Sequence, residues 1–219
     1  MSNKVDSFYE KELKPLLEGY LSNEAMSKVD DAFVFAREAH KDQFRASGEP
    51  FILHPLNVAK ILAEHHTSAD IIITALLHDV VEDTGVGLEV LKEKFGEDIS
   101  EFVKLLTGLK NINFSSEEEG QAENLRKLLL AMASDVRVVL IKIADRVHNM
   151  RTLNYLTPDK QLKIAQETMD IYVPIVHRLG MYAFKWELED LSFRYIHPEE
   201  YKKLSKLVAK RRKDREEYI

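Results

Sequence analysis

The segment LLHDVVED, residues 76–83, concentrates side chains that can bind metal ions or move protons. On a helix, residues four positions apart share a face, so His78 would lie beside Glu82. Asp79 would lie beside Asp83 for the same reason. Three acids and a histidine within six residues repel one another unless a cation sits among them, which favours a metal site. The competing interpretation is a solvated, charged helix terminus.

The segment IKIADRVHNMRT, residues 141–152, offers another acid among hydrogen-bonding side chains. Asp145, Asn149 and Thr152 fall on one helical face, so a helix here would present a carboxylate, an amide and a hydroxyl together. The alternative for Asp145 is a structural ion pair with a neighbouring arginine. His54 follows a loop with glycine and proline and precedes a predicted helix, where a single histidine is more often structural than catalytic.

Most of the eight histidines have simpler interpretations. His65 and His66 end a predicted helix, where a cationic ring is favoured by the helix dipole. His40, His177 and His197 have no acidic neighbours in a metal-like arrangement, so they are interpreted as surface or core residues. The specificity of the candidate site comes from the order of histidine, histidine–aspartate and aspartate along the chain, preceded by a loop arginine.

The elements that position these residues are predicted to be helices. The chain has only eight glycines and six prolines, separated by long intervals, which suits a mostly helical protein better than a β-sandwich. Periodicity and boundary residues predict helices over residues 7–21, 27–41, 54–66, 69–83, 87–95, 97–108, 119–134, 136–153, 159–178, 181–196 and 198–217. The expected fold class is all-α, a helical bundle. The β-branched runs 71–73 and 136–143 could instead be buried strands, and the polar stretch 110–120 is expected to be a mobile loop.

Composition limits the classes of protein that the chain can form. Its 219 residues suit one domain, or one domain with a short appendage. It contains no cysteine, which excludes disulfides, thiolate zinc sites, iron–sulfur clusters and a cysteine nucleophile. A net charge of −6 argues against nucleic-acid binding by a basic surface. No apolar run approaches the roughly 18 residues of a membrane helix and the N-terminus has no apolar signal core, so a soluble cytoplasmic protein is expected.

Residues 54, 78–79 and 145 match the H…HD…D signature of HD-domain metal-dependent phosphohydrolases. Longer motifs are similar to the N-terminal hydrolase domain of the RelA/SpoT-homologue enzymes, the long-form alarmone synthetase/hydrolases: AHKDQFRASGEPFILHP, ALLHDVVEDT, QAENLRKLLLAMASDVRVVLIKIADRVHNMRTL and YVPIVHRLGMYAFKWELEDLSFRYIHP. The resemblance covers roughly residues 30–219. It implies an HD-domain helical bundle that removes the 3′-pyrophosphate of the stringent-response alarmones ppGpp and pppGpp, giving GDP or GTP and pyrophosphate.

The resemblance also implies a role for each candidate residue. One Mn²⁺ would be ligated by His54, His78, Asp79 and Asp145. The attacking water would be positioned and deprotonated by Glu82 and Asp83. The nucleotide would be bound by Arg45 stacked on the guanine, by Ser47 near the base edge, and by Asn149 and Thr152 at the ribose or base. Two imidazoles and two carboxylates without thiolate suit a hard ion such as Mn²⁺ better than a closed structural zinc site.

Two further features bear on specificity and on domain organisation. Ala46 stands where many relatives carry a basic residue, which bears on the preference between ppGpp and pppGpp. The resemblance implies that residues 1–196 form the hydrolase domain. It also implies that the charged helix 197–219 leads to a synthetase domain, absent from this chain, as its partner. No membrane partner and no direct binding of nucleic acid are expected.

Two other functions fit the same residues. One is an HD phosphohydrolase of another nucleotide, whose base would use the Arg45–Ser47 segment and the face of Asn149 and Thr152 differently. The other is a regulatory or interaction domain whose helices over 159–217 transmit a signal to a synthetase domain. Glu82 and Asp83 favour catalysis, because a pure binding module has no need of two acids beside the candidate ligands.

Overall fold

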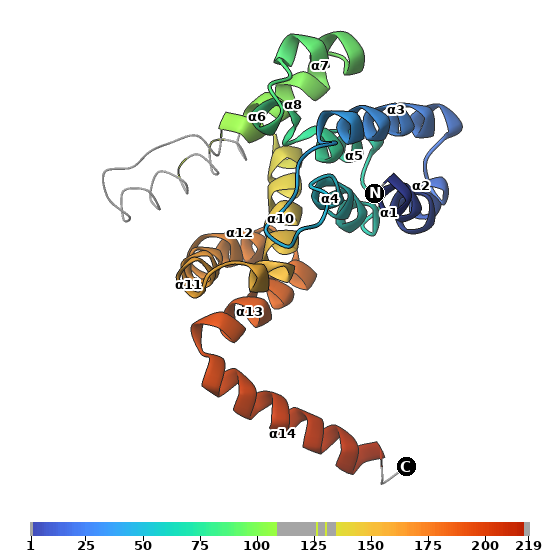
Figure 1. Ribbon diagram of the computed structural model, residues 1–219. Coiled ribbons are helices and arrows are strands. Elements are labelled where there is room, and N and C mark those ends of the chain that lie inside the picture. The colour runs from blue at the N-terminus through green and yellow to red at the C-terminus, as the bar shows by residue number, and fades with distance from the viewer. Residues whose placement is uncertain (1, 109–125, 127–129, 131–134, 217–219) are drawn as a thin grey trace. The chain divides into compact units, whose positions relative to one another are not determined.

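The computed structural model describes residues 2–108, 126, 130 and 135–216 (Figure 1). Within these ranges the secondary structure is helical, and the one extended pairing is an isolated bridge between Phe44 and Pro50. The prediction of an all-α fold is confirmed. The predicted loop 110–120 and most of the predicted helix 119–134 lie outside the described residues.

The described helices group into two compact units, Met1–His148 and Asn149–Ile219. The first unit contains α1 (Ser2–Phe8), the π-helical turn η1 (Tyr9–Leu13), α2 (Lys14–Glu18), α3 (Asn23–Ala39), α4 (Leu53–Ala63), α5 (Ala69–Leu77), α6 (Val80–Asp83), α7 (Leu88–Phe95), α8 (Glu97–Gly108) and most of α10 (Val136–Arg151). The second unit contains the 3₁₀ turn η2 (Leu153–Tyr155), α11 (Pro158–Glu167), the π-helical turn η3 (Thr168–Tyr172), α12 (Val173–Arg178), α13 (Tyr182–Ile196) and α14 (Pro198–Glu216). The domain boundary expected at residue 196 stays a prediction.

Helix α5 is enclosed within the first unit, packed against α3, α4 and α8. Every side chain from Ile71 to Leu77 is buried, so no face of this segment meets water. Apolar residues all round are typical of a helix that its neighbours surround, which explains why the run 71–73 is helical. The hydroxyl of Thr74 is satisfied within the helix, because it donates to the carbonyl of Asp70. The second ambiguous run, 136–143, lies in α10 and is helical too.

The predicted helix 69–83 is divided in the structure at His78 and Asp79, between α5 and α6. Nδ1 of His78 lies 2.7 Å from the carbonyl oxygen of Ala75. In an uninterrupted helix, that carbonyl would accept from the amide of residue 79. Helical hydrogen bonding resumes where the amide of Asp83 donates to the carbonyl of Asp79 at 2.9 Å. The imidazole of His78 therefore contacts a carbonyl of the last turn of α5, where the candidate ligands begin.

In the second unit, α13 contacts α11, η3, α12 and α14. Its buried face consists of Phe184, Leu188 and Ser192. The guanidinium of Arg151 pairs with Glu187 on α13 at 2.6 Å. These helices agree with those predicted over 159–178, 181–196 and 198–217. Among the described residues, no helix combines the length and the apolar character needed to cross a bilayer.

We expect Leu76→Ala to lower the free energy of unfolding by about 2–5 kcal/mol, because it removes a fully buried side chain of α5 and leaves a cavity. Leu16 on α2 is 38% exposed, so Leu16→Ala is a control with a much smaller loss. Urea unfolding followed by circular dichroism measures both variants. Equal losses would contradict the enclosed position of α5.

Candidate metal centre

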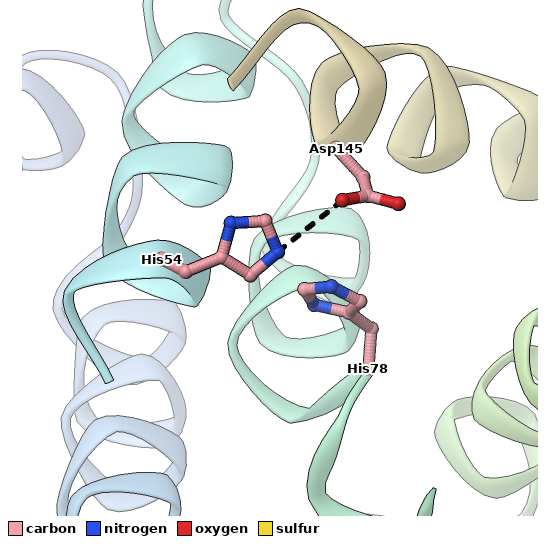
Figure 2. Close-up of side chains that lie close together, drawn as sticks. All are labelled: His54, His78 and Asp145. Carbon is pink, nitrogen blue, oxygen red and sulfur yellow. Dashed lines mark ion pairs between the residues drawn. The ribbon is translucent and has the colours of Figure 1, made fainter. Parts of the chain in front are cut away.

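Three helices of the first unit bring His54, His78 and Asp145 together, as Figure 2 shows. His54 lies in the first turn of α4, His78 directly follows α5, and Asp145 lies on α10. One ligand-type atom from each residue lies within 4.8 Å of the other two, and all three side chains are buried. This group could hold a metal ion.

Asp79, the fourth predicted ligand, lies in the same cluster. Its Oδ2 atom is 3.1 Å from Nε2 of His78 and 3.6 Å from Nε2 of His54, and its side chain is only 2% exposed. Nε2 of His54 in turn lies 3.2 Å from Oδ1 of Asp145. The structure thus gathers all four predicted ligands, and their role as ligands stays a prediction.

The hydrogen bond of His78 leaves its Nε2 suited to bind a cation. A carbonyl oxygen only accepts, so the contact with Ala75 requires the proton on Nδ1. In the neutral imidazole the lone pair is then on Nε2, the atom that faces Asp79. Metal-binding histidines are commonly held in this way by a backbone carbonyl. This tautomer and the set of nitrogen and oxygen donors both fit a bound metal ion.

Lys142 stabilises the charged form of Asp145 from the same helix. Its Nζ lies 2.7 Å from Oδ2 of Asp145, with 13% of the lysine side chain and 5% of the aspartate side chain exposed. Burial raises the pKa of the Asp145 carboxyl, but the Lys142 charge and the adjacent His54 outweigh it and hold this pKa well below its usual range. Burial lowers the pKa of His54. At neutral pH the two are a carboxylate and a neutral imidazole, the forms that bind metals.

The other ring nitrogen of His54 faces a residue that the sequence analysis did not single out. Nδ1 of His54 lies 2.7 Å from Nδ1 of His148, across a sequence separation of 94 residues. The His148 side chain is buried. A spacing signal was available: His148 follows Asp145 by three residues on α10, so the two share a helical face.

The loop 44–50 carries both residues that are expected to bind the base. The amide of Arg45 donates to the carbonyl of Glu49, and the amide of Gly48 donates to the carbonyl of Arg45, each at 2.9 Å. Gly48 has φ 80°, a left-handed conformation that closes the turn and favours glycine. The hydroxyl of Ser47 accepts from the amide of Glu49 at 3.4 Å. The loop is therefore a tight turn held by its own backbone.

The guanidinium of Arg45 lies beside the cluster. Its NH1 atom is 2.9 Å from Nδ1 of His54 and 3.2 Å from Nδ1 of His148. Burial lowers the pKa of this guanidinium. The structure therefore places Arg45 against a predicted metal ligand, and its stacking on a guanine stays a prediction, as does the role of Ser47.

The two predicted catalytic acids lie on α6, directly after Asp79. Glu82 is half-buried and Asp83 is exposed. Gln43 holds this segment, because its Nε2 donates to the carbonyl of Asp83. Its Oε1 lies 2.7 Å from Nδ1 of His40, a buried ring. His40 is thus a core residue, which was one of the two interpretations given for it. Its link through Gln43 to the segment with Glu82 and Asp83 was not recognised from sequence.

Asn149 and Thr152 belong to the second unit. Both are half-buried, and the hydroxyl of Thr152 donates to the carbonyl of Asn149 at 3.4 Å. Their expected contact with the ribose or base stays a prediction.

A model of the HD-domain family matches residues 32–182, more than half of the chain. The matched range contains His54, His78, Asp79 and Asp145, the residues that the structure gathers in one cluster. The chain belongs to the HD-domain family.

Curated relatives support the narrower resemblance. A probable guanosine-3′,5′-bis(diphosphate) 3′-pyrophosphohydrolase of Synechocystis sp. is 51% identical over 185 residues, 84% of this chain and 24% of that protein. The guanosine-3′,5′-bis(diphosphate) 3′-pyrophosphohydrolase of Haemophilus influenzae is 52% identical over 186 residues, 85% of this chain and 28% of that protein. The bifunctional (p)ppGpp synthase/hydrolase SpoT of Escherichia coli is 44% identical over 207 residues, 94% and 30% of the two chains. The predicted resemblance to the RelA/SpoT-homologue enzymes is confirmed, and the chain spans less than a third of these relatives.

A solved structure shares the fold. It is the structure of a protein described as a metazoan ortholog of SpoT that hydrolyzes ppGpp and plays a role in starvation responses. The two structures match with a TM-score of 0.64. The match covers 80% of this chain and 96% of the other at 24% identity. At this identity the likeness supports the helical fold alone.

We expect Lys142→Met to lower the free energy of unfolding of the metal-free protein at neutral pH by on the order of 3 kcal/mol, because it takes the nearest cation from a buried carboxylate. In the wild type, the stabilising contribution of Asp145 is present above its unfolded pKa of about 3.9 and is lost as the pH falls through its lower folded pKa. In the variant, burial raises the pKa of Asp145, so this carboxyl becomes neutral at a higher pH. The difference in the free energy of unfolding between wild type and variant therefore shrinks on acidification.

Urea unfolding of both proteins at neutral and at mildly acidic pH measures this difference. Lys92→Met is the control, because Lys92 pairs with Glu97 at the surface, with both side chains largely exposed. A loss for Lys142→Met no larger than that of the control would contradict the role assigned to Lys142.

Proposed function

We propose that the chain is a Mn²⁺-dependent hydrolase that removes the 3′-pyrophosphate of ppGpp or pppGpp, giving GDP or GTP and pyrophosphate. The observation that carries the proposal is the buried cluster of two imidazoles and two carboxylates, in an HD-domain chain with relatives named as hydrolases of this nucleotide. The chain spans less than a third of those relatives, and the activity in their names supports the proposal. Degradation of stringent-response alarmones would be its physiological role.

The four clustered side chains would hold the ion: His54, His78, Asp79 and Asp145. Imidazole nitrogens and carboxylate oxygens without thiolate favour ions such as Mn²⁺. When bound, such an ion lowers the pKa of a coordinated water and screens phosphate charge, so that hydrolysis proceeds near neutral pH. The tautomer of His78 and the charged form of Asp145 support this assignment, since each presents a lone pair without first losing a proton.

Glu82 and Asp83 would handle the proton of the attacking water. The hydrogen bond from the amide of Asp83 to the carbonyl of Asp79 keeps this acidic turn next to a proposed ligand. A carboxylate here accepts a proton from the water that attacks the phosphorus bonded to the 3′ oxygen. As the new O–P bond forms, the bond between that phosphorus and the 3′ oxygen breaks, and the 3′ oxygen takes up a proton.

Arg45 would contact the guanine base. Its guanidinium lies against His54 and His148 in the structure, so stacking on a base would require the side chain to turn away from these rings. A planar guanidinium suits both partners, because it can donate in its plane and stack on its face. The other proposed contacts of the base edge and ribose are Ser47, Asn149 and Thr152.

We also propose a synthetase domain of the same longer chain as the partner of this one. The relative from Escherichia coli is named as both a synthase and a hydrolase, and 94% of this chain aligns with 30% of that protein. The charged helix α14 would lead towards such a domain. The cytoplasmic location of the chain stays a prediction.

Incubation of the purified chain with ppGpp, with and without Mn²⁺, tests the proposed reaction. We expect Mn²⁺-dependent formation of GDP together with intact pyrophosphate, because the attack falls on the phosphorus at the 3′ oxygen. Ion-exchange chromatography separates the products. Release of single phosphates would move the attack to another phosphorus. No reaction, with Mn²⁺ bound, would overturn the proposed substrate.

We expect Asp79→Asn and Glu82→Gln to separate metal binding from catalysis. Asp79→Asn removes an anionic ligand, so Mn²⁺ affinity and turnover should fall together. Glu82→Gln removes a proton acceptor, so turnover should fall by about 10²–10⁴-fold while Mn²⁺ affinity stays within a few-fold of the wild type. Calorimetric Mn²⁺ titration and initial rates measure the two effects.

Glu89→Gln is the matched control for these carboxylate substitutions, because Glu89 is an exposed acid on α7. It should leave both Mn²⁺ affinity and turnover unchanged. A loss of Mn²⁺ binding in Glu82→Gln would instead make Glu82 a ligand.

A further inference from the structure

We propose that His148 is a positioning residue of the metal centre: its Nδ1 accepts a hydrogen bond from Nδ1–H of His54 and so keeps the lone pair of His54 on Nε2, the atom that binds the ion. The contact between the two Nδ1 atoms is 2.7 Å long and buried. This inference rests on the proposed metal site, and it does not depend on which nucleotide is hydrolysed.

The two candidate histidine ligands have the same requirement. A neutral imidazole binds a metal through one nitrogen, and the other nitrogen carries the proton and needs an acceptor. For His78 the acceptor is the carbonyl of Ala75. For His54, Nε2 faces the carboxylates of Asp145 at 3.2 Å and Asp79 at 3.6 Å. If Nε2 binds the ion between these carboxylates, the acceptor for the His54 proton must lie at Nδ1.

His148 is the group that can supply this acceptor. Two nitrogens 2.7 Å apart form a hydrogen bond only if one carries the proton and the other has a lone pair. If Nε2 of His54 is to bind a cation, the proton lies on His54 and the lone pair lies on Nδ1 of His148. His148 then carries its own proton on Nε2.

Arg45 makes this choice of tautomer consequential. Its NH1 atom only donates, and it lies 2.9 Å from Nδ1 of His54 and 3.2 Å from Nδ1 of His148. Donation to His54 would favour the tautomer with the proton on Nε2, directed at Asp145, which cannot bind a cation there. In the binding tautomer the single lone pair on Nδ1 of His148 accepts from His54, so neither Nδ1 atom can accept from Arg45. The guanidinium would then turn away from both rings, as its proposed stacking on the guanine also requires. His148 therefore favours the binding tautomer of His54 against its cationic neighbour.

The placement of His148 makes water a poor substitute for it. His148 is 7% exposed, His54 is 3% exposed, and the ring centroids are 4.9 Å apart. His148 also lies on the helix that supplies Asp145, three residues further along α10. One rigid element thus carries a proposed ligand and the group that orients another.

Mn²⁺ titration of the metal-free 219-residue chain by calorimetry tests this role in three variants. His148→Leu removes the acceptor, and we expect Mn²⁺ affinity to fall about 10–100-fold. His148→Asn places a carbonyl oxygen near the position of Nδ1 and should retain affinity within a few-fold of the wild type. His148→Gln reaches past that position and should behave like the leucine variant. His177→Leu, at an exposed histidine on α12, is the control and should leave affinity unchanged.

Nitrogen-15 NMR of the imidazoles gives a second readout, since the proton of His54 should lie on Nδ1 in the Mn²⁺-free wild type more than in His148→Leu. Unchanged affinity in His148→Leu would overturn the proposal. If that variant does not fold, equal losses in His148→Asn and His148→Gln would overturn it instead. Failure of the wild type to bind Mn²⁺ would remove both the metal site and this inference. Binding without hydrolysis of ppGpp would remove only the proposed substrate.

Discussion

Two carboxylates enclosed beside two imidazoles are the constraint on which the first unit depends. Asp79 and Asp145 are 2% and 4% exposed, and an ionised carboxylate is costly to bury without compensating charge or hydrogen bonds. Lys142 supplies such a charge to Asp145 from the same helix. Nε2 of His54 lies near both carboxylates, and Nε2 of His78 lies near Asp79. A divalent cation bound among these side chains would balance the remaining negative charge of the two carboxylates.

The helices around this cluster restrict the movement of its members. α5 is apolar on every side and ends where the imidazole of His78 takes the carbonyl of Ala75. That hydrogen bond orients the ring and requires its proton on Nδ1. Asp79 follows at the start of α6, so the acidic turn begins beside the cluster. The end of α5 and the orientation of a proposed ligand therefore coincide at this point.

Sequence predicted the fold class and the four clustered residues for different reasons. Widely spaced glycines and prolines indicate long helices, and the HD signature marks the candidate ligands before any distance is known. The division of the helix at His78 was not predictable from periodicity. The spacing of apolar residues indicates which face of a helix is buried, but not which backbone carbonyl a side chain will contact. The contacts of His148 with His54 and of Gln43 with Asp83 span 94 and 40 residues, so sequence did not reveal them, although the spacing of His148 from Asp145 was a local signal. Contacts of that kind follow from packing, which a single sequence does not display.

Charge explains how an acidic chain could hold a polyanionic nucleotide. The chain as a whole carries −6, so long-range attraction to phosphate is weak. Around the cluster, however, Lys142 and Arg45 offset the two buried carboxylates, while Glu82 and Asp83 on α6 add negative charge beside it. The proposed Mn²⁺ would offset the charge of these acids at a buried site, where electrostatic interactions are strong. Phosphate binding would in this way depend on metal binding, and an acidic surface elsewhere would not oppose it at the site.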